Sequence, residues 1–142
     1  MKKNFNFLLV SLSRKIRAYF KSETANHPIT FEQLRILGYI LRFEGINQSD
    51  LADLLETKKI SISKGVDALV ALDLLKRIKS ERDKRHYHLF LTPDGQVVAN
   101  NLKILSDSFF EKITLHINNK DLDVFFNVLE QIHKNIDDLT KD

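Results

Sequence analysis

The segment from Asn47 to Thr92 constrains the fold most, because its apolar residues follow a helical spacing twice and then a strand spacing, in a fixed order. It begins with a short helix that Asn47 can cap and whose buried side carries Leu51, Leu54 and Leu55. A break at residues 56–58 follows, and a second amphipathic helix comes next. Its inner face carries Ile62, Val66, Leu69 and Val70. After the polar run 80–85, apolar residues recur at every second position up to Leu91, which predicts two strands joined by a hairpin tip.

Positive charge is concentrated in this hairpin. Residues 76–88 hold six Lys/Arg against two Asp/Glu, whereas the whole chain has 22 against 19, so the remainder is slightly acidic. A cationic, solvent-facing tip beside two short helices is suited to binding phosphates, which release counterions on contact. The order of elements predicts a helix-turn-helix with a basic wing, and we expect double-stranded DNA as the partner.

The 142 residues predict a single domain, and 43% hydrophobic with 29% charged residues is typical of soluble globular proteins. The absence of Cys excludes disulfides and Cys-based zinc sites. The longest apolar run near the start, residues 7–10, is too short for a signal segment or a membrane span. We therefore expect a cytoplasmic location, no membrane association and no cofactor.

Helical stripes flank the central segment on both sides. Residues 5–26 and 94–140 predict terminal helices rich in Phe and Leu, around a winged helix-turn-helix lobe at 30–92. The expected fold is mainly α (α+β). The first helix after Pro93 is expected to run without a breaker to residue 116 or 117, about 30 Å long, and to end at residues 118–119. Such apolar stripes exceed what a free monomer exposes, so a homodimer through the terminal helices is expected.

Several short motifs occur at characteristic places along the chain. They are Thr30 with Gln33, Leu51-Ala52, Asp83-Lys84-Arg85, and Leu91-Thr92 with Gly95. In this combination the chain resembles the MarR family of bacterial transcription regulators over nearly its whole length. The resemblance implies a winged-helix homodimer that usually represses genes and is often released by a small aromatic or phenolic ligand. A two-fold dimer places two reading helices on successive turns of DNA, which predicts an inverted-repeat operator. One departure is Asp73, which stands where the family usually has Gly; Asp tolerates a left-handed backbone better than most residues.

Candidate DNA-binding residues fall into two groups. The second helix of the motif offers Lys58, Lys59, Ser61, Ser63 and Lys64, and the wing offers Arg82, Lys84 and Arg85. The resemblance implies that Arg85 reaches the minor groove, that Asp83 braces the wing and that the second helix enters the major groove. The alternative is that both groups are solvated surface. The helix has no Arg, the usual reader of guanine edges, so sequence preference is expected to depend on DNA shape.

Other functions find less support in the sequence. The five His residues match no metal-ligand spacing, so no metal site is expected, and the four Gly form no phosphate-binding loop. Paired nucleophile and base residues do not stand out, so the chain is not expected to be an enzyme. A winged-helix module that binds proteins without DNA is the main alternative; its second helix should then be neutral or apolar. Periodicity leaves the residues of any ligand pocket unknown.

Overall fold

The computed structural model describes residues 4–141. Within them it contains six helices and two strands: α1 (Phe5–Glu23), α2 (Phe31–Arg42), α3 (Gln48–Leu54), α4 (Lys59–Ala71), β1 (Leu75–Lys79), β2 (Tyr87–Leu91), α5 (Pro93–Ile113) and α6 (Asn119–Leu139). The chain forms two compact units, the first ending at Ile104 and the second beginning at Leu105. The expected mainly helical fold with a small sheet is confirmed. All wing and helix-turn-helix residues belong to the first unit.

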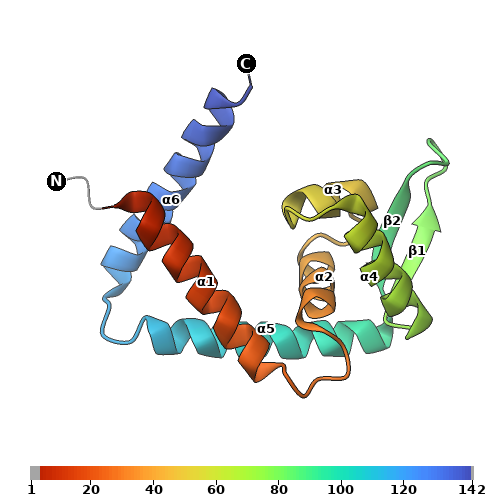
Figure 1. Cartoon of the computed structure of the whole chain (residues 1–142), viewed down its shortest axis with the longest axis horizontal. Helices are drawn as coiled ribbons and strands as arrows, with labels where there is room; N and C mark the ends of the chain where they lie inside the picture. Colours follow the sequence, from red (N-terminus) through yellow and green to blue (C-terminus); the bar gives the residue numbers. More distant parts are fainter. Residues whose placement is uncertain (1–3, 142) are drawn as a thin grey trace. The chain divides into compact units, whose positions relative to one another are not determined.

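The core of the first unit lies where α2, α3 and α4 meet the two strands (Figure 1). The largest fully buried side chains are Leu37, Ile40, Leu51, Val66, Leu69, Leu75 and Leu89. Contact between α2 and α4 is close, because a Cβ at Gly65 would come within 2.7 Å of Ile36 Cδ1. This packing fixes which face of α4 turns away from the core.

Capping residues begin the first two helices of the lobe as the sequence predicts. Thr30 Oγ1 accepts a hydrogen bond from Gln33 N (3.2 Å), and Gln33 Oε1 accepts one from Thr30 N (2.9 Å). Asn47 Oδ1 accepts from Ser49 N (2.8 Å) at the start of α3. These local bonds set the entry points of α2 and α3.

The wing is an antiparallel hairpin in which Leu75 pairs with Leu91 and Lys79 with Tyr87. The chain before α3 adds to its inner edge: Gly45 N donates to Leu89 O (2.9 Å) and Leu89 N donates to Ile46 O (3.0 Å). The strands are thereby held against the helix-turn-helix, while the tip extends past their ends (Figure 1).

Buried Thr92 joins the wing to α5. Its hydroxyl donates to Asp73 O (2.6 Å) and accepts from Gly95 N (3.0 Å) at the first turn of α5. A Cβ at Gly95 would lie 1.9 Å from Leu74 O, so only glycine fits this approach. Asp73 has a φ of +56°, which confirms the left-handed turn expected at this position.

Three details of the sequence interpretation were wrong. Leu54 and Val70, expected on buried helix faces, are exposed because they sit at the margins of their apolar stripes. Helix α5 ends at Ile113 rather than at 116 or 117. The chain then turns through His116, whose φ is +69°, and Asn118 caps α6 by accepting from Asp121 N (2.8 Å).

The two terminal helices α1 and α6 bury none of their described side chains. Large apolar residues are exposed on both of them. They include Phe5, Phe7, Leu8, Val10 and Leu12 of α1, and Val124, Phe125, Phe126, Val128 and Ile136 of α6. Among the described helices, none has the length and apolarity to cross a membrane.

Candidate nucleic-acid interface

The N-terminal half of α4 presents polar and cationic side chains to solvent. Lys58 is the N-cap residue, and Lys58, Lys59, Ser61 and Lys64 are exposed, while Ser63 is half-buried. The opposite face of the helix carries the buried residues Ile62 and Val66. The first turn contains no acidic residue. This half of the helix is therefore a positively charged surface with hydroxyl donors and acceptors.

The wing tip is ordered by a short network of hydrogen bonds. Ser80 N donates to His86 O (2.9 Å), His86 N donates to Asp83 O (2.9 Å), and Asp83 N donates to Ser80 Oγ (3.3 Å). Arg82, Lys84 and Arg85 are exposed around this turn. The tip is thus a defined turn that presents three cations.

Asp83 and Arg85 form a compact pair, which we term the wing clasp. Asp83 Oδ1 accepts from Arg85 N (3.0 Å) and Nε (3.1 Å), and Asp83 Oδ2 accepts from Arg85 Nη2 (3.0 Å). The Arg85 side chain is nevertheless 88% exposed. Asp83 therefore fixes one edge of the guanidinium while the rest faces solvent.

The wing clasp shifts the pKa values of both Asp83 and Arg85. Hydrogen bonds from the Arg85 side chain and backbone lower the pKa of the Asp83 carboxyl below its ordinary value of 3.8, with a smaller contribution from nearby His86. The same side-chain bonds raise the pKa of Arg85. Both groups are consequently charged near neutral pH, so the clasp is an ion pair there.

A second pair connects α4 to the wing. Arg77 of β1 donates through Nη2 to Asp67 Oδ1 of α4 (2.6 Å), and its guanidinium carbon lies 5.4 Å from the ring centre of Tyr87 on β2. The pair neutralises the one acidic side chain in the middle of α4's exposed face. This link is not predictable from the sequence, because residues 67 and 77 carry no motif and their approach depends on the turn at Asp73.

The predicted site residues thus fall in two groups on one compact unit, the start of α4 and the wing tip. None of the described His, Asp and Glu residues gather in a group that could hold a metal ion. In the same unit, the rings of Phe20 and Phe31 stack with centroids 6.3 Å apart. Phe109 belongs to the second unit.

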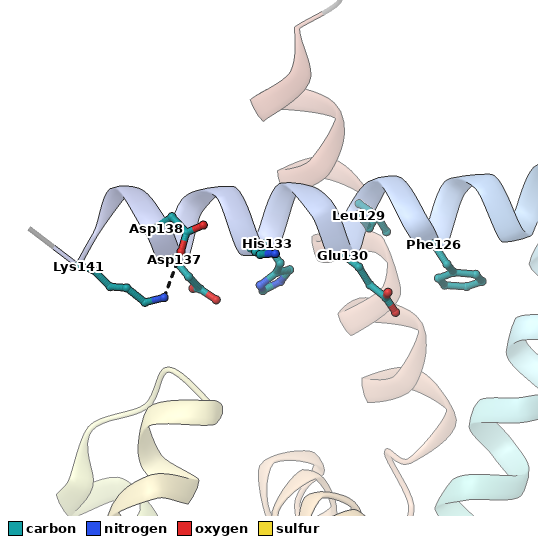
Figure 2. Close-up of a pocket in the computed structure, with 8 residues that line it drawn as sticks. Phe126, Leu129, Glu130, His133, Asp137, Asp138 and Lys141 are labelled. Carbon is teal, nitrogen blue, oxygen red and sulfur yellow. Dashed lines mark hydrogen bonds and ion pairs between the residues drawn. The ribbon is translucent and has the colours of Figure 1, made fainter.

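A groove of about 400 Å³ runs along α6 in the second unit (Figure 2). It is lined by Phe126, Leu129, Glu130, His133, Lys134, Asp137, Asp138 and Lys141. All of these residues belong to α6 or directly follow it, and Lys141 Nζ donates to Asp138 Oδ1 (3.1 Å) across a single turn. Since ligand pockets are usually walled by several elements, this groove is a helix surface and not an enclosed site.

A helix-turn-helix followed by a hairpin with a cationic tip defines a winged-helix protein of the kind that binds nucleic acid. Residues 27–86 match the sequence model of the MarR family. The transcriptional regulator SarR of Staphylococcus aureus is 27% identical over 101 residues, which cover 70% of this chain and 86% of that protein.

Solved structures agree with this classification. A MarR transcriptional regulator from Methanosarcina mazei Go1 matches with a TM-score of 0.83 at 25% identity, covering 97% of this chain and all of that one (100%). The DNA complex of MepR from S. aureus matches with a TM-score of 0.78 at 18% identity, covering 95% and 99%. The chain is therefore similar to transcriptional regulators of the MarR family, in sequence over residues 27–86 and in fold over nearly its whole length.

Proposed function

We propose that the protein is a homodimeric repressor that binds an inverted-repeat operator, with α4 in the major groove and the wing tip in the minor groove. The observation that carries the proposal is the pairing of the wing clasp with the cationic start of α4 on one compact unit. Lys58, Lys59, Ser61, Ser63 and Lys64 are the proposed contacts from α4. Arg82, Lys84 and Arg85 are those from the wing, with Asp83 as the brace.

Electrostatics support DNA as the partner. The acidic Asp67 on the outer face of α4 is paired with Arg77, so the remaining charge of that face is positive. Lys side chains mainly position a protein on phosphates, and Arg at the tip of a wing suits a narrow minor groove. A DNA complex has been solved for the structurally similar MepR.

The terminal helices support a dimer. Phe7 of α1 is 64% exposed and Phe125 of α6 is 46% exposed, and both lie among other exposed apolar residues. Free monomers rarely expose apolar surfaces of this extent, and a second copy of the chain would cover them. A two-fold dimer would place two α4 helices on successive turns of the duplex, about 34 to 36 Å apart, and therefore read an inverted repeat.

The proposal includes release from DNA by a small aromatic or phenolic effector. Two observations support it: the similarity to the MarR family, and the stacked pair Phe20 and Phe31, which offers an aromatic surface beside the start of α2. Its test is a panel of simple phenols and aromatic acids added to the protein–DNA complex. A member that lowers DNA affinity in wild type, and less in a Phe31→Ala variant, would support it.

The test of DNA binding combines selection and salt titration. Selection of bound duplexes from random DNA should enrich an inverted repeat, and light scattering should give the mass of a dimer. With about 6 to 10 phosphate contacts, log affinity should fall with log salt at a slope near −0.9 per contact. A flat salt response and no enriched sequence would refute the proposal and favour a module that binds proteins.

A further inference from the structure

An exposed isoleucine stands in the middle of the proposed DNA-reading surface. Ile60, in the first turn of α4, is 64% exposed, with Lys59 before it and Ser61 after it. Single exposed apolar residues are common on protein surfaces and need no explanation by themselves. What distinguishes Ile60 is its position on the helix.

Ile60 lies on the face of α4 that points away from the core. Residues 60, 64 and 67 follow one another at four and three positions, so they share one face, opposite the buried Ile62, Val66 and Leu69. The orientation of that face is fixed, because Gly65 brings α4 into close contact with α2. Ile60 therefore occupies the place from which a helix in the major groove touches base edges.

The chemistry of Ile60 and of the residues on the same face limits which groups of a base pair Ile60 can contact. Ile60 offers no hydrogen bond, and in the major groove the apolar feature of a base pair is the 5-methyl group of thymine. Lys64, one turn later on the same face, suits a phosphate or a purine edge. Asp67, two turns along, is held by Arg77.

We propose that Ile60 reads a thymine methyl group in each half-site and is thereby a specificity-determining residue of α4. The inference rests on the proposed function and deepens it. It does not depend on the wing, because the thymine methyl group lies in the major groove and the wing tip is proposed for the minor groove. The contact adds sequence preference to a helix that has no Arg.

The experiment uses the duplex that the wild-type protein selects from random DNA. This duplex is resynthesised with deoxyuridine in place of thymine, first throughout and then one position at a time, and affinities are measured by fluorescence anisotropy at fixed salt. Removing one buried methyl group should cost about fourfold in affinity, or about fifteenfold when both half-sites lose it. The loss should come from one or two positions in each half-site.

Three variants make the test specific. In Ile60→Ala the uracil duplex and the thymine duplex should bind equally, because the side chain that sensed the methyl group is gone. Ile60→Val should keep part of the discrimination. Leu72→Ala, which changes an exposed aliphatic side chain at the other end of α4, should discriminate as wild type does. Both sites, Ile60 and Leu72, are exposed, so folding should be unaffected in all three variants, which thermal unfolding checks.

Several outcomes would overturn the inference. They are a wild-type protein indifferent to uracil, an Ile60→Ala variant with the wild-type loss, or a selected half-site without thymine. Failure of the proposed function looks different: no sequence is enriched from the random pool and affinity does not respond to salt. The two failures are therefore distinguishable.

Discussion

Replacing Asp83 by Ala distinguishes two explanations of the role of Asp83 in DNA binding, because they predict opposite changes in DNA affinity. If Asp83 is only a negative charge near the phosphates, its removal should strengthen DNA binding. If it braces Arg85, its removal should weaken binding. Asp83 accepts three hydrogen bonds from Arg85, all between 3.0 and 3.1 Å, and these hold the guanidinium in one orientation.

We expect the bracing effect to be the larger one. A carboxylate about 10 Å from a phosphate in water, at physiological salt, changes affinity by less than about twofold. Ordering a long side chain that was free before binding costs about threefold to tenfold in affinity per wing. A dimer should therefore lose about tenfold to a hundredfold in Asp83→Ala.

Fluorescence anisotropy with the selected duplex at fixed salt measures this loss. Glu81→Ala is the matched control, because it removes the same charge from the same tip outside the clasp; it should bind equally well or slightly better. Asp83→Asn should lie between wild type and Asp83→Ala, since its amide oxygen still accepts a hydrogen bond. Unchanged or tighter binding by Asp83→Ala would refute the brace.

Three further predictions follow from the same contacts. Arg85→Ala should weaken binding about tenfold to a hundredfold with no change in melting temperature, because the side chain is 88% exposed; equal losses in both would indicate a structural Arg. Thr92→Val loses both hydrogen bonds of a buried hydroxyl and should lower the free energy of unfolding by about 2 to 3 kcal/mol, seen as a melting temperature about 5 to 10 °C lower. Because the folded-state pKa of Asp83 lies below its ordinary 3.8, the contribution of the clasp to stability is present above pH 3.8 and is lost only as pH falls through the lower, folded-state pKa. The ¹³C chemical shift of the Asp83 side-chain carboxyl in NMR should therefore show its own titration step only below pH 3.8.

The parts of the fold that sequence predicts well are those set by short-range chemistry. The capping box at Thr30 and Gln33 and the cap at Asn47 depend on atoms within three residues of each other, and both form as expected. The left-handed turn at Asp73 follows from a residue type that tolerates positive φ. The alternation before Leu91 likewise specifies the second strand of the wing.

The end of α5 shows where such signals become ambiguous. Leu115 and Ile117 continue an apolar spacing past the helix, although both are exposed in the turn that follows it. Asn118 could end one helix or begin the next, and the structure shows that it caps α6. Residue type alone does not decide between these roles, since Asn is favoured at both kinds of position.

The number of cations in residues 76–88 does not by itself define the DNA-binding surface, because some of these cations form ion pairs within the protein. Among the six cations of residues 76–88, Arg77 is paired with Asp67 and Arg85 with Asp83, and neither pairing is visible in the charge balance. The Arg77 pair removes a negative charge from the face of α4 but also removes Arg77 from the cations available to phosphates. The Arg85 pair keeps its guanidinium exposed and gives it a direction. Fewer phosphate contacts per wing are therefore expected than the sequence count suggests, with more of the wing's charge used for orientation.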